Sequence, residues 1–170
     1  HDFVEGMYRT HKTVPSIPAW LVCDAAFVQK YGLGAIHPGT TKLSPFQATD
    51  YIRTATDLRV LAAKIGVDAD GFADTVKRAN RHAESGSDPE FGKGDTELNR
   101  FNGDLDHGPN PCLGPIATPP FVAMKVWPAE IGCSIGIAAS ADGEVLDREG
   151  EAIPGLYACG NDMSSVMAGA

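Results

Sequence analysis

The sequence predicts an α+β fold in which a mixed α/β region, residues 1–118, precedes a strand-rich region, residues 119–170. Two amphipathic helix patterns lie close together between residues 56 and 84. From Pro120 onward, short apolar runs alternate with turn residues instead. Hydrophobic residues make up 43% of the 170 residues, which is enough for a buried core. The change of pattern near residue 118 is the predicted domain boundary.

The first part of the chain shows short elements separated by prolines. Apolar side chains four residues apart predict a helix over residues 2–11. Pro15 and Pro18 then indicate an extended linker, because each proline disfavours helix in the residue before it. Further predicted elements are a strand over 19–23, a short helix over 25–30 that Asp24 caps, and a loop over 31–44.

The strongest helical signal is a pair of helices joined by a tight link. In the first helix, Leu58, Leu61 and Ile65 share one face, and Gly66 ends it. Asp68 is placed to cap the second helix two residues later. So short a link predicts an αα-hairpin.

The rest of the chain reads as a long connection followed by strands. Residues 85–115 are rich in Gly, Asp, Asn and Pro, which predicts an exposed connection with one helical turn at 96–101. Asp142-Gly143 is a hairpin-turn pair. The predicted strands cover residues 121–127, 133–139, 144–146 and 156–159.

The candidate site is the stretch that follows the last predicted strand. Pro154-Gly155 indicates a turn into that strand, and Gly160-Asn161-Asp162 leads from it into a predicted helix of small residues. A strand that enters a helix in this way presents backbone N–H groups and two polar side chains at one point. Polyol hydroxyls or a phosphate can bind there. An ordinary strand-to-helix turn is the alternative interpretation.

Composition and spacing argue against several other functions. The formal charge of −8 without a basic block argues against nucleic-acid binding. No apolar run is long enough to span a bilayer. The four cysteines contain no C-x-x-C pair and are predicted to be reduced, mostly buried thiols, as in cytoplasmic proteins. The histidines and acidic residues show no metal-ligand spacing, so no metal site is predicted. No G-x-S-x-G surrounds a serine.

The motif Ile-Pro-Gly-Leu-Tyr-Ala-x-Gly-Asn-Asp at 153–162, followed by Ser165-Val166-Met167, resembles the late FAD-contacting segment of one flavoprotein superfamily. That superfamily contains the fumarate reductase and succinate dehydrogenase flavoproteins and the 3-ketosteroid Δ1-dehydrogenases. The resemblance extends upstream over nearly the whole chain. It implies that residues 1–118 form a cap, or substrate, domain and that residues 119–170 form a β-rich piece of the FAD-binding domain.

The stretch from Lys125 to Gly136 discriminates between branches of the superfamily. Gly132 stands where fumarate reductases carry a substrate-binding histidine, so this group is missing. The run is more similar to that of ketosteroid dehydrogenases, although Ala129-Glu130 replaces Gly-Asp and Ile135 replaces the first of two glycines. A side chain at that position reduces backbone approach to a ligand.

The resemblance implies an FAD-dependent dehydrogenase that oxidises a carbon–carbon bond next to a ketone, with a steroid as the candidate small-molecule substrate. For the cofactor, Gly160, Asn161 and Asp162 are the first candidates and Gly136 and Ser165 the weaker ones. The catalytic residues are unknown, because the matching tyrosine and glycine motifs fall outside residues 1–170. No G-x-G-x-x-G follows a strand, so the chain is expected to be a fragment, inactive alone. A dicarboxylate-type flavoprotein and a non-catalytic binding module remain the alternatives.

Overall fold

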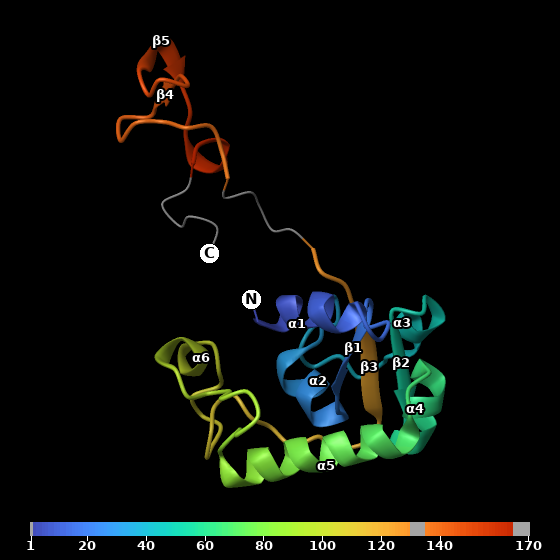
Figure 1. Cartoon of the computed structure of the whole chain (residues 1–170). Coiled ribbons are helices and arrows are strands. Elements are labelled where there is room, and N and C mark those ends of the chain that lie inside the picture. The colour runs from blue at the N-terminus through green and yellow to red at the C-terminus, as the bar shows by residue number, and fades with distance from the viewer. Residues whose placement is uncertain (1, 130–134, 165–170) are drawn as a thin grey trace. The chain divides into compact units, whose positions relative to one another are not determined.

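The computed structural model describes residues 2–129 and 135–164, and the chain divides into two compact units (Figure 1). The first unit is His1–Trp127 and the second is Pro128–Ala170. Helices and small sheets occur together, as the predicted α+β class requires.

The first unit is organised around a three-stranded antiparallel sheet. Its strands are β1 (Ala19–Cys23), β2 (Ile52–Ala55) and β3 (Phe121–Val126), in the order β1-β3-β2. The central strand, β3, is covered on both faces, because Val122 and Ala123 are both fully buried although successive side chains point to opposite sides. Val122 packs in one apolar cluster with Val28 and Ile52, whereas Ala123 packs in another with Leu61 and Ile65.

The described part of the first unit also contains six helices, and side-chain caps start most of the predicted ones. They are α1 (Asp2–His11), α2 (Ala25–Tyr31), α3 (Ser44–Ala48), α4 (Leu58–Ile65), α5 (Ala69–Ser85) and α6 (Glu97–Phe101). Asp24 and Asp68 cap α2 and α5 by accepting backbone N–H groups, which confirms these two predicted caps, and Asp57 caps α4 in the same way. Gly66 ends α4 in the left-handed region at φ 76°, and α4 packs on α5 as the predicted hairpin.

The structure contains two elements in the first unit that were not predicted. Helix α3 has Pro45 in its first turn but no side-chain cap, so one of the two usual start signals is missing. Strand β2 has only four residues and joins the sheet by pairing with distant β3. Because β3 completes this first sheet, the division into compact units falls after Trp127, whereas the change of sequence pattern lies near residue 118.

The second unit contains a small antiparallel hairpin and a short helical turn. Its elements are β4 (Glu144–Leu146), β5 (Ala152–Tyr157) and the 3₁₀ turn η1 (Gly160–Asp162). The predicted turn at Asp142-Gly143 is confirmed: Gly143 has φ 81°, and its N–H bonds to the Ser140 carbonyl at 3.0 Å.

Two strand predictions in this unit need correction. The last strand begins at Ala152 rather than at residue 156, because the chain reverses earlier, where the Asp147 carboxylate accepts the N–H groups of Glu149 and Glu151. Pro154-Gly155 therefore lies inside β5, at an irregularity in the pairing with β4. The described part of the predicted strand 133–139 forms only isolated bridges, Ile137 with Met163 and Ala139 with Val145. The helix predicted after Asp162 falls largely outside the described residues.

Within the described ranges, no helix combines the length and the hydropathy that crossing a bilayer requires.

Candidate functional site

Two segments far apart in the sequence meet in the second unit, at the end of the last strand. The N–H of Ile137 donates to the Asp162 carbonyl at 2.9 Å, and the N–H of Ser164 donates to the Ile137 carbonyl at 2.9 Å. These bonds form a parallel bridge between Ile137 and Met163. The structure therefore brings Gly136 next to Asp162, the last residue of the Gly160-Asn161-Asp162 turn.

Gly136 is a glycine because another stretch of backbone passes very close to it. A Cβ atom at this position would lie 2.4 Å from the Met163 carbonyl carbon and oxygen and 2.7 Å from the Asp162 carbonyl oxygen. The Ser164 hydroxyl also donates to the Gly136 carbonyl at 3.2 Å. The close packing of the two segments is therefore a structural reason for this glycine, whether or not a flavin lies nearby.

The 3₁₀ turn η1 presents polar groups that have no partner within the described residues. Gly160 has φ 59° with open space where a Cβ would be, and Asn161 and Asp162 are exposed. No hydrogen bond within the described ranges uses either of those two side chains or the N–H groups of Gly160 and Asn161. Together they offer donors and acceptors that match a polyhydroxylated ligand. The fifth candidate, Ser165, lies outside the described residues.

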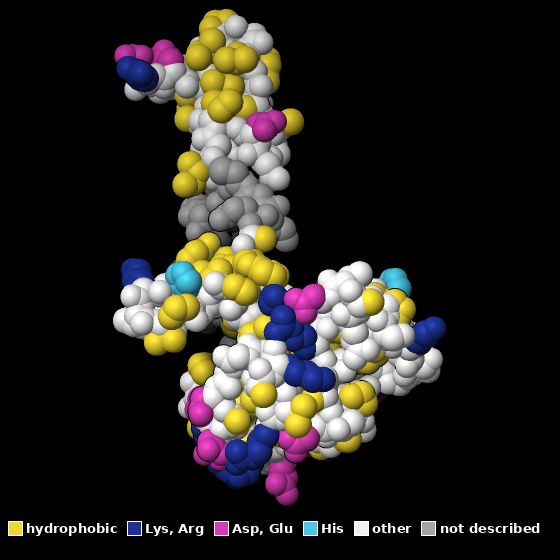
Figure 2. Space-filling view, turned by 90° about the vertical axis from the view of Figure 1, so that its right-hand side faces the viewer, with side chains coloured by type: hydrophobic (Ala, Val, Ile, Leu, Met, Phe, Trp, Pro, Cys, Tyr) yellow, Lys and Arg dark blue, Asp and Glu magenta, His cyan; other side chains and the backbone are white. Residues whose placement is uncertain are grey.

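The second unit also exposes several apolar side chains. Ile137, Ile153, Leu156 and Tyr157 are exposed by 52%, 39%, 47% and 66%, and hydrophobic side chains gather on this unit at the top of Figure 2. Residues in the middle of β5 are exposed on both faces of the hairpin, which is unusual for so apolar a strand. The second unit thus exposes both a polar turn and apolar surface, and a ligand with a ring system and hydroxyl groups can use both.

The described cysteines differ widely in exposure. Burial, with a smaller contribution from Asp24, raises the pKa of the Cys23 thiol to about 12, so this thiol stays protonated and unreactive. Cys112 is partly buried and Cys159 is exposed, and all three are free thiols. The prediction of mostly buried cysteines is therefore wrong for Cys159.

Two tyrosines of the first unit, Tyr31 and Tyr51, have structural hydrogen-bond partners, whereas Tyr8 on α1 is 52% exposed. Tyr51 accepts the Ala35 N–H at 2.9 Å, and the Tyr31 hydroxyl donates to Asp104 at 2.5 Å. Lys30 also bonds to Asp104 at 2.5 Å, and these hydrogen bonds, the one from Lys30 first, lower the pKa of the Asp104 carboxyl to about 2. Sequence reasoning missed this cluster, because 73 residues separate Tyr31 from Asp104 and no local pattern links them.

Comparison with known proteins identifies relatives that match over nearly the whole chain. The model of the FAD binding domain family matches residues 1–170. A 4-oxocyclohex-2-ene-1-carboxylate 5-dehydrogenase from Sinomonas cyclohexanicum is 38% identical over 169 residues, which are 99% of this chain and 29% of that protein. A 3-oxosteroid 1-dehydrogenase from Mycobacterium tuberculosis is 37% identical over 89% of this chain and 27% of its own length.

Solved structures give the same result. The 3-ketosteroid Δ1-dehydrogenase from Sterolibacterium denitrificans, in complex with 1,4-androstadiene-3,17-dione, aligns with TM-score 0.88 and 38% identity over 98% of this chain and 30% of that chain. A flavocytochrome c3 fumarate reductase aligns over 98% of this chain and 24% of that chain, with TM-score 0.59 and 21% identity, which shows a shared fold alone. The chain thus spans less than a third of the length of these relatives.

Proposed function

Since the chain belongs to the FAD binding domain family, we propose that the protein is an FAD-dependent dehydrogenase that introduces a carbon–carbon double bond next to the carbonyl of a cyclic ketone. The observation that carries the proposal is 38% identity over 99% of the chain to a dehydrogenase of an oxocyclohexene carboxylate. The structural similarity to a 3-ketosteroid Δ1-dehydrogenase supports the same reaction class.

In this proposal the two compact units have different tasks. The first unit, with its buried three-stranded sheet, forms the cap over the substrate, and the second unit forms part of the FAD-binding domain. The apolar side chains exposed on β5 support this role for the second unit, because an isolated hairpin gains little stability unless it packs on further structure.

The residues of the turn η1 fit contact with the cofactor. The Asn161 amide can donate to one ribityl hydroxyl and accept from another. The Asp162 carboxylate accepts from hydroxyl groups but repels phosphate, so the ribityl chain suits this position better than the pyrophosphate does. FAD, when bound, supplies the acceptor for the hydride that leaves the substrate.

We assign no catalytic residue to the described part of the chain. Removal of two hydrogens next to a carbonyl requires a base for the proton and donors that polarise the carbonyl. Tyr31 and Tyr51 already hold structural hydrogen bonds, and the buried Cys23 thiol stays protonated.

Turnover by purified full-length protein tests the reaction class. The protein is mixed with an artificial electron acceptor and with either a 3-ketosteroid or 4-oxocyclohexanecarboxylate. Formation of the α,β-unsaturated ketone from at least one of them supports the proposal. Reduction of fumarate, with no oxidation of either ketone, would favour the dicarboxylate alternative, and absence of any bound flavin would favour a binding module.

Flavin titration of an Asn161→Leu variant tests the site. Loss of the amide leaves hydroxyl partners unpaired at a cost of about 1–3 kcal/mol, which is roughly a tenfold to hundredfold loss of FAD affinity. Asn102→Leu, an exposed asparagine in the first unit, is the matched control and should leave affinity unchanged. Unchanged affinity together with a lower apo-protein melting temperature in Asn161→Leu would make Asn161 a structural residue.

A further inference from the structure

The first unit contains two adjoining hollows, of about 910 Å³ and 410 Å³, that we call the trough. The larger one lies between α2 and the segment 93–118, and the smaller one between β1, α5 and the segment 88–93. Both have Phe27, Lys93, Leu113 and Gly114 in their lining. Each volume is in the range of small-molecule sites.

The walls of the trough are largely apolar. Phe27 of α2, Leu113 and Pro115 line both hollows, and Leu21 of β1 and Ile116 add to the smaller one. Such walls favour a ligand with a hydrocarbon ring or chain, because contact with them removes apolar surface from water.

Most basic side chains along the trough have a partner. Lys30 pairs with Asp104 at 2.5 Å and Arg78 with Glu90 at 3.0 Å. His82 Nδ1 lies 3.4 Å from the Asp88 carboxylate, and His107 Nε2 is 2.8 Å from the Leu113 carbonyl oxygen. Lys93 is different: among the described residues, its ammonium group has no carboxylate or carbonyl partner.

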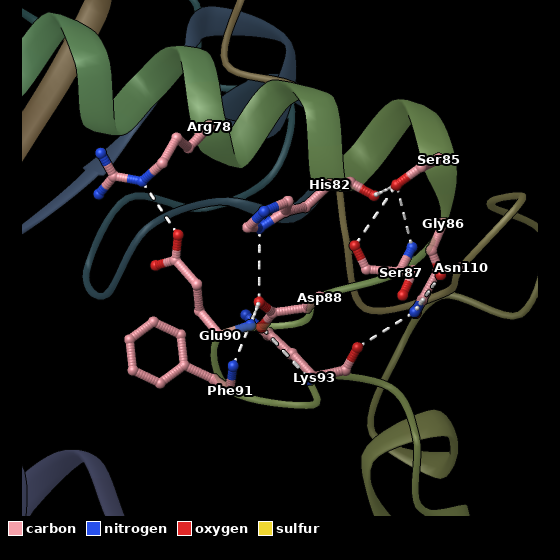
Figure 3. A network of polar contacts seen from close by, with 10 residues as sticks. All are labelled: Arg78, His82, Ser85, Gly86, Ser87, Asp88, Glu90, Phe91, Lys93 and Asn110. Carbon is pink, nitrogen blue, oxygen red and sulfur yellow. Dashed lines mark hydrogen bonds and ion pairs between the residues drawn. The ribbon is translucent and has the colours of Figure 1, made fainter.

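Buried polar side chains fix the backbone of Lys93 at both ends (Figure 3). The Lys93 N–H donates to the Asp88 carboxylate at 3.3 Å, and its carbonyl accepts from the Asn110 amide at 3.1 Å. Asp88 is 6% exposed and Asn110 is 2% exposed. At Gly94, which has φ 90°, a Cβ would lie 2.2 Å from Asn110 Oδ1, so the loop depends on glycine at this position. Asp88 and Asn110 therefore fix the backbone of Lys93, a residue that lines both hollows, while its side chain is exposed and its ammonium group has no carboxylate or carbonyl partner among the described residues.

We propose that the trough binds an organic monocarboxylate with an apolar ring or chain, whose carboxylate pairs with Lys93. A single unpaired cation matches a single negative charge. A dianion such as a phosphate ester would be repelled more strongly by the carboxylates that line the hollows, which are those of Asp24, Asp88, Glu90 and Asp104. Every group that carries this proposal belongs to the first unit, whereas the candidate FAD contacts at Gly160-Asn161-Asp162 belong to the second.

Calorimetric titration of the full-length, flavin-loaded protein with cyclohexanecarboxylate tests this assignment. Two further probes separate the contributions: cyclohexanecarboxamide has the ring without the charge, and acetate has the charge without the ring. We expect cyclohexanecarboxylate to bind more tightly than either. Lys93→Met should raise its Kd about fivefold, as loss of one solvent-accessible ion pair does, and should leave the carboxamide unaffected.

Two more variants complete the design. Lys42→Met removes an exposed lysine that lines neither hollow, and it should bind like the unmodified protein. Gly114→Leu fills the junction, where a Cβ would meet only His107 Nε2 at 3.9 Å, and it should abolish binding while the melting temperature is retained. The proposal would be overturned if cyclohexanecarboxylate bound to Lys93→Met and Lys42→Met with equal Kd. It would also be overturned if the calorimetric binding signal survived in Gly114→Leu, or if the unmodified protein showed no binding at millimolar probe concentration.

Discussion

Replacement of Asp24 by alanine should destabilise the first unit far more than loss of an ordinary helix cap. Asp24 is only 3% exposed, and both of its carboxylate oxygens bind backbone. One oxygen accepts the Phe27 N–H at 2.9 Å at the start of α2. The other accepts the N–H groups of Ala117 at 2.9 Å and Thr118 at 2.8 Å, just before β3. The side chain therefore joins α2 to the entry of the central strand, across more than ninety residues.

The expected cost follows from these three bonds. Loss of a helix cap costs about 1 kcal/mol, and each backbone N–H left without its acceptor costs about 1–3 kcal/mol. Ala117 and Thr118 are exposed residues, so water can bond to their N–H groups in place of the lost carboxylate. We therefore expect the free energy of unfolding to fall by about 3–4 kcal/mol in total. Asp57→Ala is the matched control, because the Asp57 side chain caps α4 at the surface and, within the described ranges, accepts only from the N–H groups of Arg59 and Val60. That variant should lose about 1 kcal/mol.

Urea denaturation of the full-length protein, followed by tryptophan fluorescence at constant pH, measures both variants. Trp20 lies in β1, on the sheet that Asp24 helps to assemble, so its emission reports this transition. If Asp24→Ala and Asp57→Ala shifted the unfolding free energy by the same amount, the link to Ala117 and Thr118 would contribute nothing, and the reasoning would be refuted.

Three further predictions concern other parts of the molecule. Gly136→Ala places a Cβ 2.4 Å from Met163 and should separate the segment around Gly136 from the segment around Met163. The full-length variant should therefore bind FAD more weakly. An FAD affinity equal to that of the unmodified protein would contradict the importance of this close packing. Hydrogen bonds from Arg53 first and then from Lys125 lower the pKa of the Asp50 carboxyl to about 2 from its ordinary value of 3.8. Because the folded state favours the charged Asp50 carboxylate, any excess in melting temperature of the unmodified protein over Asp50→Asn should be present above pH 4 and disappear as the pH falls towards 2. A melting-temperature difference that grew on acidification would contradict this. A thiol reagent at neutral pH should modify Cys159 in the native protein and Cys23 only after unfolding, which mapping of the modified peptides by mass spectrometry can check.

Local signals predicted much of the fold, and long-range contacts account for most of what was missed. The capping carboxylates of Asp24, Asp57 and Asp68 mark three helices, because a cap and its helix are adjacent in sequence. Strand β2 was missed, because four residues of mixed polarity become a strand only by pairing with β3, which lies far along the chain. The early start of β5 was missed for a related reason, since Pro154-Gly155 is a turn signal that here marks an irregular strand.

In the candidate site, too, some residues could be predicted from local sequence and others depend on long-range contacts. Gly160-Asn161-Asp162 could be chosen from local sequence, because small polar residues after an apolar run indicate a ligand-accessible turn. The resemblance to flavoproteins added Gly136, but the physical reason for that glycine, the approach of Met163, became visible only in three dimensions. Lys93 had no signal in sequence, since its position depends on Asp88 and Asn110, two buried partners from different parts of the chain.

Anaerobic absorbance spectroscopy of the full-length protein tests the central claim most directly. The purified protein should show the absorbance bands of oxidised flavin near stoichiometric occupancy. Addition of a 3-ketosteroid or of 4-oxocyclohexanecarboxylate without any electron acceptor should bleach those bands and yield the unsaturated ketone in equal amount. A protein that contains flavin but is bleached by neither ketone would contradict the proposed dehydrogenation, and a protein without flavin would contradict the assignment of FAD itself.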